Sequence, residues 1–225
     1  MRRTGRFRTT LSSKVAVALS GLGLAGFVVF HMLGNLQVFE GPGAYNKYAA
    51  FLREMPMVLW TVRLGLLTVA VVHIVRAIQL ALRNRRARPV AYTVRAYRVA
   101  SLASRTMALT GSLLLLFIVF HLLHLSADLV DSSFHDHVDE RGHADVFSKV
   151  IHAFHNPLYV LLYCAGQLVL GMHLSHAISG SLQTLGFEHA VRNRVFKAVG
   201  PSVALFVMLG NLVIILAVFF GLVRT

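Results

Sequence analysis

The chain has few of the residues that crosslink or interrupt a fold, with one cysteine and five prolines among 225 residues. The single cysteine, Cys164, excludes an intrachain disulfide and any Cys-x-x-Cys motif. A proline inside a helix removes a hydrogen bond and clashes with the preceding turn. We therefore expect the five prolines to lie at or outside the ends of helices. They are Pro42, Pro56, Pro89, Pro157 and Pro201.

Long apolar segments dominate instead. Hydrophobic residues make up 56% of the chain, and the mean hydropathy of +0.66 exceeds what a soluble domain of this size needs. Five runs are each long enough to cross a hydrocarbon core of about 30 Å. They cover residues 15–39, 57–82, 106–127, 157–182 and 199–222. None shows the period-two alternation of a membrane strand. The sequence therefore predicts one all-α domain, an integral membrane bundle of five transmembrane helices.

Acidic residues are scarce and unevenly distributed. There are nine, against 22 lysines and arginines, and eight of the nine lie in the first and third connections between the segments. Basic residues concentrate before the first segment and in the second and fourth connections. The positive-inside rule therefore places the N-terminus in the cytoplasm and the C-terminus outside. Because membrane topology accounts for the basic residues, we expect no nucleic-acid partner.

Each of the first four segments carries a histidine, and their depths match in pairs. An ionisable side chain inside a membrane is costly and indicates a functional site. With a helical rise of about 1.5 Å per residue, His31 and His121 lie ~24 and ~22 Å from the inner ends of their segments. By the same rise, His73 and His173 each lie ~15 Å from the inner end. The sequence thus predicts an outer pair and an inner pair of imidazoles.

Two imidazoles saturate a haem iron and leave no open coordination site, which suits electron transfer. We therefore predict two b-type haems that carry electrons across the bilayer. The outer haem would be held by His31 and His121, and the inner haem by His73 and His173. Packed structural histidines or a proton path are the other interpretation, and they explain four depth-matched histidines less well.

Two further histidines leave the choice of ligands open. His124 follows His121 by one turn and His176 follows His173 likewise, so each shares a helix face with its neighbour. Depth favours His121 and His173, because the alternates lie about 4.5 Å nearer to a membrane surface.

Three polar residues in the inner half of the segments are expected to contact haem propionates. They are Ser20, Arg76 and Arg105. Arg76 is the best placed, one turn from His73, although a basic side chain at this depth also reaches the headgroups by snorkelling. Glycines such as Gly21 and Gly111 would let a flat macrocycle approach a helix backbone, and ordinary helix packing in membranes favours them too.

Several sequence blocks resemble a known family. The blocks Ser12–Lys14, Ala18–Gly21, His31–Phe39 and Tyr45–Ala49 are similar to the cytochrome b558 membrane subunit of succinate dehydrogenase. This is the dihaem, five-helix, single-subunit type of anchor, related to the anchors of dihaem fumarate reductases. The H-x-x-G-N-L-x-x-F pattern of the third block is the most specific. The block Gly171–His176 also looks like the family, in which the first histidine of that block is the ligand.

The resemblance implies a function as well as a fold. It implies an outer haem between the first and third spans and an inner haem between the second and fourth, in agreement with the depths. It implies a flavoprotein subunit and an iron–sulfur subunit on the cytoplasmic face of a prokaryotic cell membrane. Electrons from succinate would pass through these partners to the haems and then to a membrane quinone, usually menaquinone. The complex can also form a higher oligomer.

Two connections carry further expectations. The stretch 45–52 reads as an interfacial helix with aromatic anchors. The connection 83–105 carries seven arginines interleaved with aromatic and aliphatic residues, which predicts an amphipathic surface helix or a docking face for the iron–sulfur subunit.

The quinone site is expected near the outer haem. Quinone reduction takes up protons, and Glu54 is the carboxylate best placed at the outer edge to exchange them. Trp60, Arg63 and His155 are expected to complete the pocket. The rival is a site at the inner face, with haem as a side branch. Without a quinone, Glu54 would be an exposed acid of little energetic consequence.

Two other functions compete with this interpretation. A cytochrome b subunit of a hydrogenase or formate dehydrogenase would also hold two haems, but it usually receives electrons from the outer side. A transporter or channel lined by histidines would hold none. A haem spectrum separates the second alternative from the first.

Overall fold

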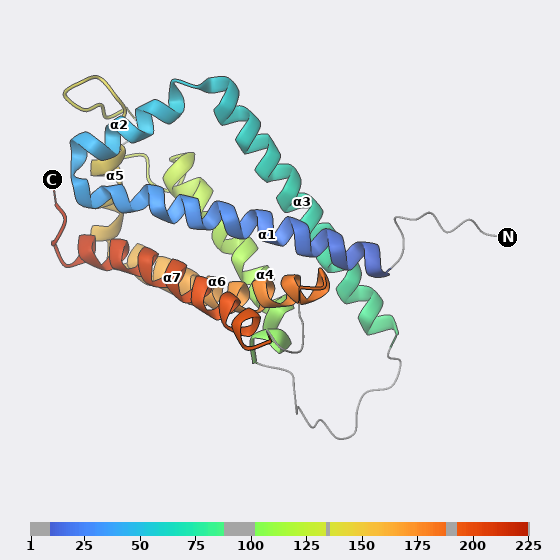
Figure 1. The fold of residues 1–225 in the computed structure, drawn as a ribbon. Coiled ribbons are helices and arrows are strands. Elements are labelled where there is room, and N and C mark those ends of the chain that lie inside the picture. The colour runs from blue at the N-terminus through green and yellow to red at the C-terminus, as the bar shows by residue number, and fades with distance from the viewer. Residues whose placement is uncertain (1–9, 88–101, 134–135, 188–192, 225) are drawn as a thin grey trace.

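The computed structural model describes residues 10–87, 102–133, 136–187 and 193–224. The described chain is all-α (Figure 1). Its elements are α1 (Thr10–Asn35), the 3-10 turn η2 (Leu36–Glu40), α2 (Pro42–Arg53), α3 (Pro56–Arg86), α4 (Leu102–His121), the π-helical turn η3 (Leu122–Ser126), α5 (Val146–His155), α6 (Pro157–Thr184) and α7 (Asn193–Phe219). Five helices are long and apolar enough to cross a membrane: α1 with η2, α3, α4 with η3, α6 and α7. The chain is a multi-pass membrane protein.

Proline positions match the prediction at three helix starts and contradict it at one. Pro42, Pro56 and Pro157 each open a helix, where the missing N–H would have no partner. Asn156 caps α6 by accepting a hydrogen bond from the Leu158 N–H at 2.9 Å. The expectation for Pro201 was wrong, because it lies inside α7. The apolar run begins close to Pro201, but α7 already starts at Asn193, in the polar residues before that run, so the proline lies inside the helix.

The two ends of the bundle differ in composition. We call the end with residues 41–55 and 127–156 the acidic end, and the end where α1 begins and α3 finishes the basic end. The predicted helix over 45–52 is confirmed within α2, at the acidic end, and its place at the membrane interface stays a prediction. The stretch 128–150 was expected to be only a connection, but its last residues form the start of α5. Apolar residues at helical spacing bury one face of α5: Phe147, Val150, Ile151 and Phe154.

Four helices are neighbours in the order α3, α1, α6, α4, and each is in extensive contact with the next. The helix α7 runs along α6 and also contacts α1 (Figure 1). The helix α3 makes its substantial contacts only with α1 and α2 and contains no buried residue. The described residues therefore leave an open side between α3 and α4. The predicted outer and inner histidines lie on diagonally opposite helices of this arrangement.

Small and polar residues bring α6 and α7 together. A side chain at Gly200 would meet the Ser175 carbonyl oxygen at 2.4 Å, so only glycine permits this backbone approach. Farther along the same interface the Asn211 amide donates a hydrogen bond to Gln167 at 2.9 Å. Helix association in lipid depends on such close contacts and hydrogen bonds because lipid supplies no hydrophobic driving force.

Candidate functional site

The histidines nearer the acidic end form a direct ring contact. The rings of His31 on α1 and His121 on α4 lie 5.9 Å apart, centroid to centroid, at an interplanar angle of 83°. We call them the acidic-end pair. Phe27 stacks on His31, and Phe117 stacks on His121. The His31 side chain is exposed.

Asn35 and Tyr45 fix the protonation of His31. The Asn35 amide donates to Nε2 of His31 at 3.2 Å, and the Tyr45 hydroxyl donates to the Asn35 carbonyl at 3.0 Å. A nitrogen that accepts a hydrogen bond carries a lone pair, so neutral His31 holds its proton on Nδ1. Burial, with a smaller contribution from Tyr48, raises the pKa of Tyr45 to about 12, which keeps it a donor.

His121 shares a hydroxyl group with one of the two alternate histidines. Tyr163 on α6 lies with its hydroxyl 3.3 Å from Nδ1 of His121 and 3.1 Å from Nδ1 of His124. His124 is 2% exposed and its ring packs on Phe120 and Tyr159. No ring contact joins His124 to His31 in the part of the chain that is described. The geometry therefore presents His121, not His124, to His31.

The histidines nearer the basic end are His73 on α3 and His173 on α6, and we call them the basic-end pair. No ring contact joins the two in the described residues. Each ring instead rests against a glycine of a neighbouring helix. A side chain at Gly21 would come within 3.0 Å of His73, and one at Gly111 within 3.3 Å of His173. These two glycines set where the rings lie.

Helix-bound groups fix the proton on both rings of this pair. Nδ1 of His73 lies 3.2 Å from the Val17 carbonyl oxygen, which only accepts, and 3.2 Å from the Ser20 hydroxyl. Nδ1 of His173 lies 3.1 Å from the Thr110 hydroxyl, whose own proton is donated to carbonyls of the preceding turn. Both histidines therefore carry hydrogen on Nδ1 and a lone pair on Nε2.

This protonation fits a metal ligand. An imidazole that binds a metal through one nitrogen usually donates the other N–H to an oxygen. Two imidazole nitrogens each about 2 Å from one metal put the ring centroids about 6 Å apart, and the acidic-end pair shows 5.9 Å. No described group of three or more histidine, cysteine or acidic residues could hold a bare metal ion. Two ligands per centre suit a metal already held in a macrocycle, and haem fits these residues.

Of the three residues predicted to contact propionates, Ser20 contacts a histidine of the basic-end pair. Ser20 faces Nδ1 of His73 and donates its proton to the Ala16 carbonyl, so its hydroxyl is already used in orienting the histidine. Arg76 is half-buried and donates to the Gln79 side chain at 3.3 Å. Arg105 is exposed at the start of its span. The other alternate ligand, His176, lies one turn farther toward the basic end.

The predicted quinone residues are not brought together. Arg63 lies over the Trp60 ring at 5.3 Å, and both are on the exposed first turns of α3. Glu54 is exposed at the end of α2, and His155 ends α5 with its Nδ1 2.7 Å from the Ile151 carbonyl. No hydrogen bond, ion pair or ring contact joins Glu54 or His155 to the Trp60–Arg63 pair among the described residues.

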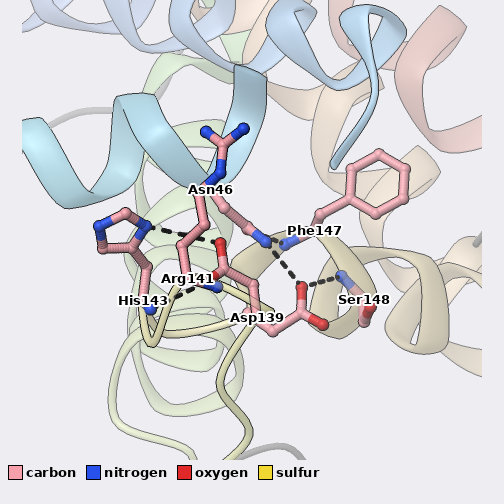
Figure 2. Close-up of polar contacts among 7 residues, drawn as sticks. Asn46, Asp139, Arg141, His143, Phe147 and Ser148 are labelled. Carbon is pink, nitrogen blue, oxygen red and sulfur yellow. Dashed lines mark hydrogen bonds and ion pairs between the residues drawn. The ribbon is translucent and has the colours of Figure 1, made fainter. Parts of the chain in front are cut away.

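A polar contact between α2 and α5 supports the acidic-end pair from outside. Asn46, which is 1% exposed, donates to Asp145 at 3.0 Å and accepts from the Phe147 N–H at 2.9 Å (Figure 2). Asp145 also caps α5 by accepting from the Ser148 N–H. In the loop before α5, Asp139 accepts from the backbone N–H groups of Arg141 and His143 (Figure 2). We call the Asn46 contacts the α2–α5 lock.

Sequence reasoning missed the groups that orient the rings. Thr110 and Tyr163 lie inside apolar segments and belong to no motif, so nothing but their depth on neighbouring helices could have singled them out. Asn46 was quoted only as part of a resembling block. The spacing of apolar residues from Phe147 to Phe154 could have revealed α5.

Comparisons of the chain with models of protein families, with curated proteins and with solved structures find no match.

Proposed function

We propose that the chain is the membrane anchor and electron-transfer subunit of a succinate dehydrogenase, a succinate:quinone oxidoreductase. The observation that carries the proposal is the contact between the His31 and His121 rings across the bundle, from α1 to α4. His73 on α3 and His173 on α6 lie nearer the basic end, each with a hydrogen-bonding group at Nδ1. The sequence blocks that resemble the cytochrome b558 anchor supply the identity of the electron donor. In this orientation the basic end faces the cytoplasm and the acidic end faces outside.

The chain's own residues would hold two b haems. His31 and His121 would bind one, and His73 and His173 the other, each through Nε2. At His31 the metal would take the Nε2 lone pair that accepts from the Asn35 amide in this structure. When bound, haem supplies one-electron transfer between ferric and ferrous iron at a six-coordinate centre. Hydroxyl and carbonyl groups behind Nδ1 orient the rings and make them stronger donors.

Partners and quinone complete the proposed function. A flavoprotein and an iron–sulfur subunit would bind at the basic end, where the connection 83–105 falls mostly outside the described residues. The quinone, menaquinone by resemblance, would be reduced near Glu54, Trp60 and Arg63 on the exposed first turns of α3. Trp60 supplies an aromatic surface there and Arg63 a positive charge.

A spectrum and a co-purification test the proposal together. Chain purified in mild detergent should give a pyridine haemochrome of two b haems per chain, with low-spin signals only. Mass spectrometry should find a flavoprotein and an iron–sulfur protein, and charge reversal at Arg95 and Arg98 should release both while haem stays bound. A preparation without haem would favour the histidine-lined transporter, and haem with an outer-face hydrogenase or formate dehydrogenase partner would favour that family.

A further inference from the structure

The tautomer of one histidine is not decided by its fixed neighbours. In three of the four histidines, a hydrogen-bond partner places the proton on Nδ1. The partner is an amide that donates to Nε2, a backbone carbonyl that only accepts, or a hydroxyl whose own proton is donated elsewhere. These histidines are His31, His73 and His173. His121 differs because its Nδ1 faces only the Tyr163 hydroxyl, which can donate or accept.

Tyr163 has one proton and two histidine neighbours. In one order, His121 donates its Nδ1–H to the phenolic oxygen, and the hydroxyl donates to Nδ1 of His124. In the reverse order, His124 donates and His121 accepts. Only the first order leaves a lone pair on Nε2 of His121, so only the first makes His121 a metal ligand.

The surroundings of His124 favour the first order. His124 borders a cavity of about 10 Å³, room for one water, whose other polar lining residues are Asp131, Lys149 and His152. In this region Asp131 lies 3.4 Å from His152, and Lys149 pairs with Asp128. Because Nδ1 of His124 faces the Tyr163 hydroxyl, a proton stabilised by the carboxylate of this cavity would lie on Nε2, and this leaves Nδ1 of His124 as the acceptor.

We propose that Tyr163, backed by His124, is the positioning residue that keeps the proton of His121 on Nδ1 and its Nε2 free to bind a metal. The metal-binding part of this inference rests on the proposed function, whereas the hydrogen-bond order does not. His124 thereby accepts the hydrogen bond of the Tyr163 hydroxyl, behind the acidic-end pair, and is not a ligand.

The first test compares two tyrosines of α6. Tyr163→Phe removes the hydroxyl and keeps the ring, which packs among Phe117, Phe120 and Phe154. Tyr159→Phe is the matched control, because Tyr159 packs on His124 but no hydrogen bond of its hydroxyl is found among the described residues. A redox titration should show one of two haem potentials shifted to more positive values in Tyr163→Phe, since His121 becomes a weaker donor. Tyr159→Phe should shift neither.

A second variant separates hydrogen-bond order from packing. His124→Phe removes the acceptor, so the Tyr163 hydroxyl is free to donate to His121 and impose the unproductive order. This variant should lose more of the acidic-end haem than Tyr163→Phe does, and the double variant should return to the level of Tyr163→Phe. Unchanged potentials in Tyr163→Phe with both haems bound, or additive losses in the double variant, would overturn the proposal.

A haem-independent readout keeps the two proposals distinguishable. In the full chain prepared without haem and labelled with ¹⁵N-histidine, the His121 signals should report a proton on Nδ1. They are assigned by their loss in His121→Ala. Tyr163→Phe should move these signals toward a mixture of tautomers, and Tyr159→Phe should not. If no haem ever binds, the proposed function fails. An unmoved His121 tautomer in Tyr163→Phe would refute the role of Tyr163 in either case.

Discussion

The acidic-end and basic-end pairs occupy one helix bundle but are held by different kinds of neighbour. The basic-end rings donate to groups whose own protons are committed to helix carbonyls, so their surroundings cannot rearrange. The acidic-end rings contact the Asn35 amide and the Tyr163 hydroxyl. Asn35 in turn contacts Tyr45 on α2, and Tyr163 contacts His124, so both contacts continue toward the acidic end. The difference teaches that two centres with the same ligands can have different sensitivity to events at the membrane surface.

The largest expected effect comes from removing a ligand. His31→Ala or His121→Ala should abolish the acidic-end centre and leave the other, whereas His73→Ala or His173→Ala should do the reverse. Each variant should lose about half of the haem, because two ligands saturate each iron. Low-temperature redox-difference spectra measure which of the two haems is lost. If His124→Ala or His176→Ala abolishes a centre while its neighbour's substitution is silent, the pairs are wrongly assigned.

A smaller effect is expected from crowding a ring. Gly21→Val should displace His73, because even a Cβ atom at this position comes within 3.0 Å of the ring. The basic-end centre should lose occupancy while the acidic-end centre keeps it. Gly26→Val, on the same helix with nothing within 4 Å of an added Cβ, is the control. Equal haem content in the two variants would contradict the close approach of His73 to α1.

Removing a fixed acceptor should weaken only the basic-end centre. Thr110→Val deletes the hydroxyl that accepts from His173 and should lower the affinity of that centre roughly 10–100-fold. Thr110→Ser, which keeps the hydroxyl, should restore it. Haem release during dilution in detergent, followed by absorbance, provides the measurement. If Thr110→Val instead released haem only from the acidic-end centre, the assignment of Thr110 to the basic-end pair would be wrong.

The smallest expected effect comes from lowering the pH, which acts on the contacts of Asp145. Burial alone would raise the pKa of Asp145, but hydrogen bonds from Ser148 and Asn46 hold it below its usual value. A lowered folded pKa means that the stabilisation is complete above pH about 4 and disappears as pH falls through the folded value. Acidification should therefore loosen the α2–α5 lock and disturb the acidic-end spectrum first. Asp145→Asn should flatten this dependence, and a basic-end spectrum that changes first would contradict it.

Much of the fold was readable in the sequence because lipid imposes simple rules. Length and hydropathy predicted five spans, and they are confirmed with shifted ends. Proline and asparagine predicted the start of α6. Helical rise alone matched His31 to His121 by depth, and these two rings lie in contact. Whether they bind haem stays a prediction.

What the sequence did not reveal depends on which helices are neighbours. The partners of the rings, Tyr163 and Thr110, come from helices far away in sequence, and no periodicity identifies them. The quinone residues were chosen for their depth, but depth does not say that α3 stands apart from α5 at the acidic end. Pro201 was misplaced because a helix can extend beyond its apolar residues.

The open side between α3 and α4 has a consequence for biogenesis. A helix that packs mainly on α1 and buries none of its residues can be displaced from the bundle at little cost. Maturation would then proceed in order: α1, α4, α6 and α7 assemble first, and α3 closes last, onto whatever bridges His73 to His173. Chains lacking that bridge would then be cut by protease at the ends of α3 sooner than finished chains.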